Sequence, residues 1–496
     1  MATFAAIDLG AQSGRVAVGR FDGERLSVTE VHRFPNVPVR TRGTLHWDVL
    51  GLYRDVLDGL RAAGREAGRV DSVAVDSWGV DFGLVDRAGR LVQNPVHYRD
   101  ARRAGAMKRV LERVPARELY ERSGIQLMPI NTVFELGAMA AEGDPSLEAG
   151  DTLLLIPDLF HFWLCGARTS ELTNASTTQC YDPRAGGWAH DLLERLDVPA
   201  RLLPDVVQPG TRLAPLDLDV AADTRLGGAT VVATATHDTG AAVASVPFRT
   251  VGSAFVSAGT WSLVGIEVGE PVITDAAFAA NLTNEAGVEG TFRLLRNVTG
   301  LWLVHECRRA WALEGHDYSF DQLVALAKQA PALRSFIEPN DPVFAEPGDM
   351  PARVRAFCAH THQAEPVEPG AVVRCILESL ALKHAQTIDL LAAVGGTAPR
   401  EVHVLGGGAR NELLCRWTAD AAGLPVHAGP EEATLYGNLI VQAMSLGEVG
   451  SLAEGRELVG ASFAPTTYLP QVSDEWREAR DRFAAAVTLP TIEVGA

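Results

Sequence analysis

The sequence predicts an α/β protein of two domains, and three observations support this prediction. With 496 residues, the chain is too long for a single hydrophobic core. Short apolar strands alternate with helical patterns in both halves, as in α/β folds. In addition, the segments Phe4–Val18 and Ala254–Gly265 echo each other. We therefore expect two related domains, residues 1–248 and 249–496.

The two echoing segments each consist of an apolar strand, a turn of small residues and a second apolar strand. In both turns a serine follows a glycine by three positions, at Gly10/Ser13 and Gly259/Ser262. Such a turn presents backbone N–H groups and hydroxyls, which suit a phosphate chain. One turn in each half predicts a nucleotide held between two related lobes.

The first half continues with a helix and several β segments. Apolar side chains recur at helical spacing through Leu45–Ala67. Val70–Asp86 returns to β character with a glycine turn, and a DRAG turn then closes a hairpin. Ala101–Glu142 is rich in helical pattern. Strands are expected at Thr152–Ile156 and Ala229–Ala235, the second leading into a helix of small residues.

The second half begins after a junction expected at Arg249–Gly252. Its later helix after the GGG turn ends at Gly423, a residue type that commonly follows a helix C-terminus. In chain order this half is expected to hold the second hairpin, helices near Leu301–Ala312 and at Pro369–Val394, a strand at Glu401–Leu405 and a core helix at Pro430–Leu446.

The charge balance argues against nucleic acid or an anionic membrane as a partner. The chain has 44 basic and 62 acidic residues, a net charge of −18. No apolar run approaches the ~20 residues of a membrane span. The first residues also lack the positive segment of a secretory signal. We expect a cytoplasmic protein whose partners are small molecules.

The cysteines and lysines exclude several classes of site. None of the six cysteines forms a CxxC pair, so we expect thiols and no metal site, with a Cys358–Cys375 disulfide as the alternative. The only lysines are Lys108, Lys328 and Lys383, and none follows a glycine. A P-loop requires Gly-Lys-Ser/Thr and a protein kinase requires V-A-I-K. Both of these nucleotide sites are therefore excluded.

Asp8 ends the first strand, in an Asp-x-Gly-x-x-Ser-Gly-Arg pattern that runs to Arg15. Glycines let the backbone approach phosphate closely, Ser13 can donate a hydrogen bond, and Asp8 can hold the shell of a Mg²⁺ ion. An ordinary hairpin turn would explain the same residues. The matching chemistry of the second hairpin favours the phosphate interpretation.

The segment Thr236–Thr239 (THDT) contains the best catalytic candidate. A hydroxyl that attacks phosphorus needs a base within hydrogen-bond reach, and Asp238 stands at a strand end. Alternatively, Asp238 N-caps the following helix. Capping would leave His237 and the threonine hydroxyls unexplained.

Three further segments are weaker signals. Gly406–Gly408 would let a phosphate or planar ring approach the backbone, although tight strand–helix connections use glycine for geometry alone. Trp78–Phe82 sets aromatic rings beside Asp81, as sugar sites do, or forms a core strand with Asp81 exposed. Arg296–Asn297 could place an amide on a sugar hydroxyl or cap a helix.

Taken together, these segments resemble the FGGY family of carbohydrate kinases, from Ile7 to about Ala443. The variants WGVDF, GTWS and NVTGLWL are typical of the branch that acts on L-rhamnulose rather than on glycerol or xylulose. The motifs that carry the resemblance are DLGAQSGR (8–15), DSWGVDFGLVD (76–86), YRDAR (98–102), RSGIQLMPINT (122–132), TNASTTQ (173–179), THDT (236–239), SAGTWSLVG (257–265), NLTNEAGVEGTFRLLRNVTGLWL (281–303), GGGARNELL (406–414) and AGPEEATLYGN (428–438).

The resemblance implies two actin-like (ribonuclease-H-like) lobes with a cleft between them. It also implies ATP-dependent phosphorylation of L-rhamnulose to L-rhamnulose 1-phosphate in rhamnose breakdown. By position, Asp238 would accept the proton and Asp8 would act through Mg²⁺. The residues that would contact the sugar are Gly79, His237, Asp238, Thr239 and Asn297. The residues that would contact ATP are Ala11, Gln12, Ser13, Gly14, Arg15, Thr260, His305 and Gly407.

Two positions depart from the family pattern. Gln12 stands in the phosphate loop where a small serine is familiar, so its side chain could crowd or supplement that contact. His305 stands where a glutamine contacts the nucleotide, and a neutral imidazole can still donate one hydrogen bond.

Three alternative functions stay open. Another sugar of the family, such as L-fuculose, xylulose or glycerol, would keep the kinase chemistry. A chaperone-type actin-fold ATPase would show no sugar-dependent rate. A sugar-sensing regulator would need a DNA-binding element, which the net charge of −18 disfavours.

Overall fold

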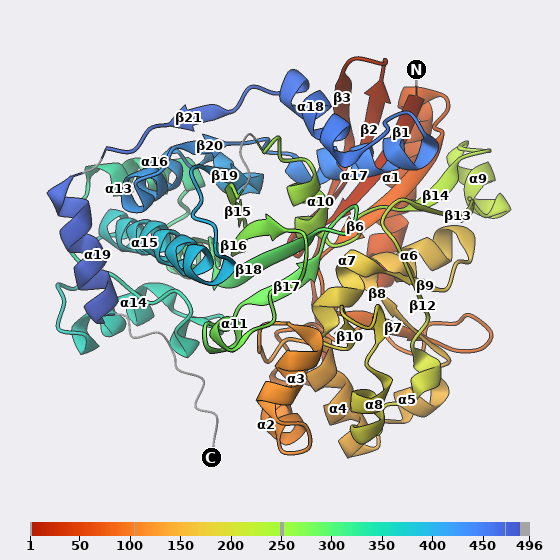
Figure 1. The fold of residues 1–496 in the computed structure, drawn as a ribbon, viewed down its shortest axis with the longest axis horizontal. Helices are drawn as coiled ribbons and strands as arrows, with labels where there is room; N and C mark the ends of the chain where they lie inside the picture. Colours follow the sequence, from red (N-terminus) through yellow and green to blue (C-terminus); the bar gives the residue numbers. More distant parts are fainter. Residues whose placement is uncertain (1, 104, 249–251, 472, 487–496) are drawn as a thin grey trace. The chain divides into compact units, whose positions relative to one another are not determined.

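The computed structural model describes residues 2–103, 105–248, 252–471 and 473–486 of the chain (Figure 1). The junction expected at Arg249–Gly252 falls mainly on residues 249–251, which lie outside the described residues, so the domain boundary stays a prediction. The chain forms two compact units. Unit 1 comprises Met1–Pro247, Val268–Leu294 and Ala433–Ala464, and unit 2 comprises Phe248–Glu267, Leu295–Glu432 and Pro465–Ala496.

Unit 1 is built on a six-stranded sheet of order β13-β14-β6-β1-β2-β3. The strands β1, β2 and β3 are antiparallel neighbours, whereas β6 is parallel to both β1 and β14. Every residue of β1 and β6 is buried, which explains their continuous apolar character. The strands are β1 (Ala2–Leu9), β2 (Ser13–Phe21), β3 (Leu26–Pro35), β6 (Ser72–Ser77), β13 (Thr211–Pro215) and β14 (Thr230–Ala233).

The helices of unit 1 include the predicted amphipathic helix, which spans Val49–Ala67 (α1). Its N-cap is Asp48, whose side chain accepts from the Gly51 N–H, and Gly68 with φ 70° ends it. The others are α2 (Ala106–Leu111), α3 (Ala116–Ser123), α4 (Thr132–Glu142), α5 (Pro145–Ala149), α6 (Ile156–Cys165), α7 (Leu172–Ala175), α8 (His190–Arg195), α9 (Leu218–Thr224), α10 (Asp238–Ala244), α11 (Asp275–Ala279), α17 (Ala433–Leu446) and α18 (Leu452–Ser462).

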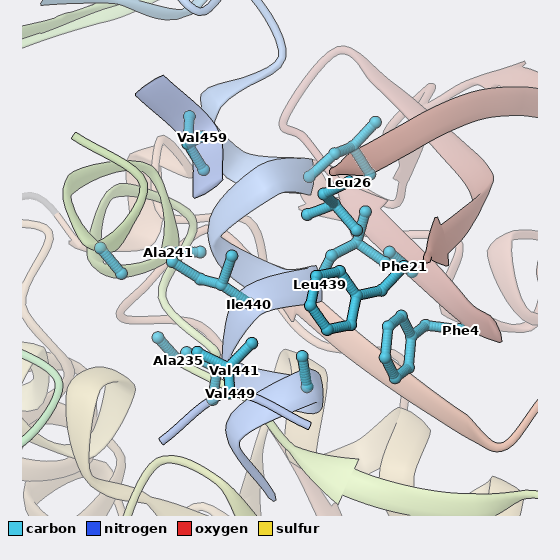
Figure 2. Close-up of a cluster of buried hydrophobic side chains, with 14 of the residues drawn as sticks. Phe4, Phe21, Leu26, Ala235, Ala241, Leu439, Ile440, Val441, Val449 and Val459 are labelled. Atoms are coloured by element: carbon cyan, nitrogen blue, oxygen red, sulfur yellow. The ribbon is translucent and has the colours of Figure 1, made fainter. Parts of the chain in front are cut away.

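The core of unit 1 brings together residues that lie far apart in the sequence. Leu439 and Ile440 of α17 pack in one buried cluster with Phe4 of β1 and Phe21 of β2 (Figure 2). Helix α17 also contacts α10 so closely that a Cβ at Gly437 would lie 1.7 Å from the Ala241 carbonyl oxygen. The predicted core helix therefore packs against the first sheet, although it begins at Ala433, more than 400 residues after β1.

A seven-stranded sheet of order β17-β18-β16-β15-β19-β20-β21 supplies the strands of unit 2, except that β17 and the first residues of β18 fall within the segment Val268–Leu294 of unit 1. Strand β15 is antiparallel to β16 and parallel to β19, and β19 is parallel to β20. From β18 to β21 this repeats the order of the first sheet from β3 to β13, including an antiparallel last strand. The strands are β15 (Ala254–Ala258), β16 (Trp261–Val268), β17 (Thr283–Ala286), β18 (Phe292–Thr299), β19 (Val402–Leu405), β20 (Val426–Ala428) and β21 (Thr466–Tyr468).

The helices of unit 2 agree with the predicted periodicity. The long helix expected at Pro369–Val394 spans Pro369–Gly395 (α15), and the helix expected near Leu301–Ala312 spans Trp302–Leu313 (α12). The helix after the GGG turn spans Glu412–Ala422 (α16) and is followed by Gly423 with φ 67°. The remaining helices are α13 (Phe320–Gln329), α14 (Met350–His360) and α19 (Asp474–Ala486).

Small elements complete the two units, and one of them changes the interpretation of Val70–Asp86. Strand β6 lies in the six-stranded sheet, but the next strand, β7, pairs with β8 instead. The DRAG turn closes a hairpin as predicted, because Val85 bridges to Leu91. These elements are β4 (Val39–Thr41), β5 (Thr44–His46), β7 (Phe82–Val85), β8 (Thr152–Leu155), β9 (Thr169–Glu171), β10 (Tyr181–Asp182), β11 (Gly187–Trp188) and β12 (Asp205–Val207), with 3₁₀ turns η1 (Ala101–Arg103), η2 (Ser176–Thr178), η3 (Ala200–Leu202), η4 (Pro342–Phe344) and η5 (Gly406–Arg410).

Two simple properties follow from the described residues. None of their helices has both the length and the apolar character needed to cross a membrane. All six cysteines are free thiols, and the Sγ atoms of Cys358 and Cys375 lie 4.0 Å apart without a disulfide.

Candidate active site

Two aspartates of unit 1 lie side by side at the carboxyl ends of parallel strands. Asp8 of β1 is in register with Asp76 of β6. Across the hairpin, Asp8 is paired with Arg15, whose Nε and Nη2 donate to Oδ2 of Asp8 at 2.9 and 2.6 Å. Arg15 therefore balances the charge of Asp8.

Asp76 is a fully buried carboxylate that our sequence reasoning did not single out. Its Oδ2 accepts from Nδ2 of Asn438 at 2.6 Å, and its Oδ1 has no hydrogen-bond partner in the described part of the chain. Burial raises the pKa of Asp76 well above its usual range, and the charge of Asp8 adds to this effect. The available signal was its place at a strand end, parallel to Asp8, in the DSWGVDF motif.

Asp238 is the first residue of helix α10, and the N-cap residue is His237. The alternative in which Asp238 itself is the N-cap is therefore wrong. One carboxylate oxygen, Oδ1, accepts from the N–H and the hydroxyl of Thr239 at 2.5 and 3.1 Å. No described residue hydrogen-bonds to Oδ2, and 34% of the side chain is exposed.

The electrostatic surroundings of Asp238 favour proton acceptance. Loss of hydration raises the pKa of Asp238, the neighbouring His237 opposes this shift, and the charge of Asp8 reinforces it. A raised pKa strengthens a carboxylate as a base. Asp8, Asp76 and Asp238 thus form one electrostatically coupled group, because the charges of both others also raise the pKa of Asp76.

His237 is held by an ion pair between Glu285 of β17 and Arg293 of β18. Nη1 and Nη2 of Arg293 each lie 3.2 Å from Nδ1 of His237, and Nη1 lies 3.2 Å from Oε2 of Glu285. Guanidinium nitrogens can only donate, so Nδ1 accepts from Arg293, and the same nitrogen also lies 3.3 Å from Oε2 of Glu285. The other ring nitrogen, Nε2, is turned toward Asp238. That nitrogen lies 3.5 Å from Oδ1 of Asp238. Sequence reasoning missed Glu285 and Arg293, because nothing local links them to His237.

The aromatic segment around Gly79 differs from both interpretations of its sequence. Asp81 is completely buried and accepts from the indole nitrogens of Trp47 and Trp78 at 2.6 and 3.1 Å and from Arg103 at 3.0 Å. Burial raises the pKa of Asp81 to about 6. The carboxylate therefore organises a buried aromatic cluster, and it is neither exposed nor available to a sugar.

The backbone next to Gly79 is held in an unusual conformation. Val80 has φ 68°, a left-handed conformation that is rare for a β-branched residue. Its N–H donates to the Thr177 hydroxyl at 3.3 Å, and its carbonyl accepts from the Thr132 hydroxyl at 2.6 Å. A Cβ at Gly79 would lie 2.9 Å from the same Thr177 oxygen. Strain of this kind is often found at ligand sites. The sugar contact of Gly79 therefore stays a prediction.

The tip of the first hairpin is braced from β3 and its following loop. The Asn36 N–H donates to the Gln12 carbonyl at 2.9 Å, and the Asn36 side chain donates to the Gly10 carbonyl at 2.9 Å. The Gln12 side chain is exposed, and its effect on a phosphate contact stays a prediction. Gly14 has a packing role, because a Cβ there would lie 2.2 Å from the ring of Phe34.

Three segments of unit 2 meet around the second hairpin. The carbonyls of Gly259 and Thr260 accept from the N–H groups of Leu301 and Gly300 at 2.9 and 3.1 Å. A Cβ at Gly300 would lie 2.6 Å from the backbone of Trp261, so only glycine fits there. The hydroxyl of Ser262 is buried and has no partner within the described residues, so this serine does not line the tip as its sequence position suggested.

The Gly406–Gly408 turn packs against the same hairpin through two of its glycines. A Cβ at Gly408 would lie 2.3 Å from Cβ of Ala258, and Gly406 has φ 72°. At Gly407, by contrast, a Cβ would meet no atom within 4 Å. The positive φ explains Gly406 and close packing explains Gly408, whereas Gly407 faces open space, as a residue beside a ligand would.

The comparisons with known proteins decide the family. The N-terminal domain model of the FGGY family of carbohydrate kinases matches residues 3–245, and the C-terminal domain model of the same family matches residues 254–446. The chain belongs to the FGGY family of carbohydrate kinases. It is also 40% identical to a rhamnulokinase of Bacteroides thetaiotaomicron, over 98% of this kinase and 99% of that protein.

Solved structures of sugar kinases share the fold at low sequence identity. A gluconate kinase from Lactobacillus acidophilus has a TM-score of 0.80 and 14% identity, with 100% of this chain and 98% of that chain covered. Plasmodium falciparum glycerol kinase with ADP has a TM-score of 0.76 and 15% identity, with 97% and 98% covered. The predicted α/β class with two actin-like (ribonuclease-H-like) lobes is confirmed, and the repeated strand order of the two sheets agrees with it.

Within this kinase the predicted site residues form two groups, one in each unit. Unit 1 contains Asp8, the hairpin tip Ala11–Arg15, Gly79 and His237–Thr239. Unit 2 contains Asn297 on β18, Thr260 in the second hairpin, His305 on α12 and Gly407. Their roles toward sugar and nucleotide stay predictions.

His305 of this kinase has a defined environment within unit 2. Its ring stacks on Phe320, with centroids 6.1 Å apart. Burial lowers the pKa of His305, and the positive charge of Arg308 adds to this effect. The ring is therefore neutral near pH 7, which keeps one N–H available for donation.

The acidic group of unit 1 is compatible with a magnesium ion that arrives with ATP. Among the described residues, no three His, Cys, Asp or Glu side chains are arranged to hold a metal ion by themselves. Magnesium sites at nucleotides usually take only one or two carboxylates, and phosphate and water supply the other ligands. Asp8, with the unpartnered Oδ1 of the neighbouring Asp76, fits that requirement.

Proposed function

We propose that this kinase transfers the γ-phosphoryl group of ATP to the 1-hydroxyl of L-rhamnulose, which gives L-rhamnulose 1-phosphate and ADP. The observation that carries this proposal is the 40% identity to a rhamnulokinase along almost the whole length of both chains. The WGVDF, GTWS and NVTGLWL variants of the family motifs support the same substrate.

In this mechanism Asp238 is the general base. As the sugar oxygen forms its bond to phosphorus, the hydroxyl proton passes to Oδ2 of Asp238, and the bond from phosphorus to the leaving ADP oxygen breaks. Oδ2 is the carboxylate oxygen that no described residue hydrogen-bonds, whereas Oδ1 is bound to Thr239. Asp238 can therefore orient through one oxygen and react through the other.

The surrounding residues of unit 1 would bind and orient the sugar. We propose that Nε2 of His237, which lies 3.5 Å from Oδ1 of Asp238, donates to a sugar oxygen. Thr239 and the backbone at Gly79 are the other sugar contacts that we propose in this unit, with Asn297 proposed from unit 2.

The phosphate chain requires positive charge and hydrogen-bond donors, which this chain supplies without a phosphate lysine. The backbone and side chains of Ala11–Arg15 are the proposed contacts in unit 1, and Thr260, His305 and Gly407 are those in unit 2. A magnesium ion bound with ATP at Asp8 would neutralise charge on the phosphate oxygens. Each of these groups acts on charge that develops on oxygen, which is the main contribution a protein makes to phosphoryl transfer.

The test is a panel of sugars in a coupled assay of ADP release, with the purified full chain, ATP and Mg²⁺. L-rhamnulose should give the highest kcat/KM, ahead of L-fuculose, D-xylulose, D-gluconate and glycerol. Success of another sugar with failure of L-rhamnulose would overturn the substrate and keep the kinase activity. ATP turnover that no sugar changes would point instead to a sugar-independent ATPase.

A further inference from the structure

The TNASTTQ motif forms a buried turn in unit 1 that the proposed mechanism leaves without a role. Residues 172–178 form α7 and η2, and all of their side chains are buried. Three hydroxyls of this turn accept backbone N–H groups from three separate segments: Thr173 from His237 at 3.1 Å, Ser176 from Ala286 at 3.0 Å and Thr177 from Val80 at 3.3 Å. The first and third of these segments carry or adjoin a residue of the candidate sugar site, and the second adjoins Glu285, which lies 3.3 Å from His237.

The turn is anchored by Glu171, whose carboxylate is completely buried. Its Oε1 accepts from the N–H of Thr173 at 2.9 Å. Its Oε2 accepts from the hydroxyl of Thr173 at 2.6 Å and from the N–H and hydroxyl of Thr236 at 2.9 and 2.7 Å. Glu171 therefore ties the turn directly to the residue two positions before Asp238.

This carboxylate is costly to bury. Among the described residues no Lys, Arg or His forms an ion pair with Glu171, so its charge is balanced by hydrogen bonds alone. Loss of hydration raises the pKa of Glu171, and the hydrogen bonds from Thr173 and Thr236 oppose this shift. An apolar or amide side chain would avoid the cost of an unpaired buried charge. The carboxylate must therefore provide something that those side chains cannot.

Its geometry identifies what a neutral amide could not provide. Each oxygen of Glu171 accepts one backbone N–H, from Thr173 at Oε1 and from Thr236 at Oε2. A glutamine has one acceptor oxygen and one NH₂ donor, so in either orientation its NH₂ would face a backbone N–H. Hydroxyl donors can rotate to accept, but backbone N–H groups cannot. Only a carboxylate can accept hydrogen bonds from both backbone N–H groups at once.

We propose that Glu171, acting with Thr173, is a positioning residue that holds the N–H groups of Thr236 and His237 and so fixes the carboxylate of Asp238 for proton acceptance. The proposal rests on the proposed function, in which Asp238 is the base. Helix α10 approaches this clamp closely, because a Cβ at Gly240 would lie 3.3 Å from Cβ of Thr173. A small displacement of the clamp would therefore move the start of α10, where Asp238 lies.

The experiment compares four variants of the full chain: Glu171→Gln, Thr173→Val, Thr173→Ser and Thr178→Val. Thr178 is a matched control, since its hydroxyl is equally buried in the same turn but bonds only to Ala175 and Cys180. Hydrogen–deuterium exchange of a peptide covering residues 234–240 is the first readout. Glu171→Gln and Thr173→Val should exchange faster than the wild type at Thr236 and His237, whereas Thr173→Ser and Thr178→Val should not.

Kinetics with the preferred sugar of the panel provide the second readout. We expect kcat per folded molecule to fall about 10–100-fold in Glu171→Gln and about tenfold in Thr173→Val, because a displaced catalytic group costs rate steeply. KM for ATP should change by less than about twofold, and Thr173→Ser should restore kcat to within about threefold of the wild type. If Glu171 and Thr173 had only a structural role, the variants would have a lower melting temperature, but kcat per folded molecule would not fall while KM for ATP stayed the same.

The two readouts separate failure of this inference from failure of the proposed function. Unchanged exchange at residues 236–237 in Glu171→Gln, or wild-type kcat in both Glu171→Gln and Thr173→Val, would overturn the positioning role. If Glu171→Gln does not fold, Thr173→Val and its serine counterpart decide the question. A wild-type protein that phosphorylates no sugar would count against the proposed function, and the exchange comparison would still decide whether the clamp holds the loop.

Discussion

The two sheets share one strand order but carry different chemistry at the same positions. In the first sheet Asp8 pairs with Arg15 across the hairpin and is in register with Asp76 on the parallel neighbour. In the second sheet the equivalent residue is Ser257, which pairs with Leu263 and is in register with Leu405. Each of these residues stands one position before the last pair of its hairpin.

The difference indicates that the two copies of the scaffold present different chemical groups at equivalent positions. Unit 1 places three carboxylates, Asp8, Asp76 and Asp238, at one end of its sheet, where the charges of Asp8 and Asp238 raise the pKa of Asp76. Unit 2 places backbone and glycine there, with Gly300 packed against its hairpin and Gly407 open. The duplicated scaffold thus offers charge in one unit and a neutral backbone surface in the other.

The largest expected effect tests the charged side of this comparison. Asp238→Asn should lower kcat about 10²–10⁴-fold, since an amide cannot accept the proton of the attacking hydroxyl. Sugar binding, measured by calorimetry, should change little, because Oδ1 can still accept from Thr239. Asp389→Asn, at an exposed ion pair with Arg480 in unit 2, is the control and should keep wild-type turnover. Near-wild-type turnover of Asp238→Asn would refute the assignment of the base.

A second variant should separate activity from stability in unit 1. Because folding raises the pKa of Asp76, the folded state holds a proton that the unfolded state has released, so the stability contribution of this group falls as pH rises from about 4 through the raised value. An asparagine does not titrate, so Asp76→Asn should not lose stability in this way as the pH rises. In Mg²⁺-free buffer we expect its melting temperature to exceed that of the wild type by about 2–4 °C at pH 8 and by less at pH 5.

The same variant should lose activity. With Mg²⁺ and ATP, kcat of Asp76→Asn should fall by about tenfold or more, because Asp76 would no longer offer a carboxylate oxygen beside Asp8 to the magnesium ion that arrives with ATP. The groups that face Asp76 are Asp8, Arg15, Asp238 and Asn438, and none of them changes. A lower melting temperature at pH 8, or wild-type kcat, would contradict this account of Asp76.

A matched pair of glycines tests the neutral side of the comparison with a smaller effect. Neither Gly300 nor Gly407 has a positive φ, so alanine is permitted by the backbone at both. Gly407→Ala should leave the melting temperature within about 1 °C and raise KM for ATP about 3–10-fold, equivalent to roughly 1 kcal/mol of binding. Gly300→Ala should instead destabilise the fold by about 1–3 kcal/mol, because its Cβ would overlap the Trp261 backbone. Equal KM values for ATP in the wild type and Gly407→Ala would indicate that the nucleotide does not contact this turn.

Prediction from sequence succeeded where the signal was local. Periodicity located α1, α12 and α15 to within a few residues, and the echoing hairpins predicted two related lobes, with which the shared strand order of the two sheets agrees. It failed where partners came from elsewhere in the chain. Asp81 looked like an exposed or sugar-binding carboxylate because its indole and guanidinium partners lie at Trp47 and Arg103, outside the motif.

The sequence by itself determined the α/β class, the duplicated hairpins and the family, because strand and helix periodicities and turn chemistry are properties of neighbouring residues. Only the tertiary structure decided which sheet each segment joins and which buried polar groups meet. Asn438 reaches Asp76 across 362 positions, and Glu171 reaches Thr236 across 65. Such pairs form because a buried carboxylate must find donors wherever the fold brings them, and sequence spacing carries no record of that distance.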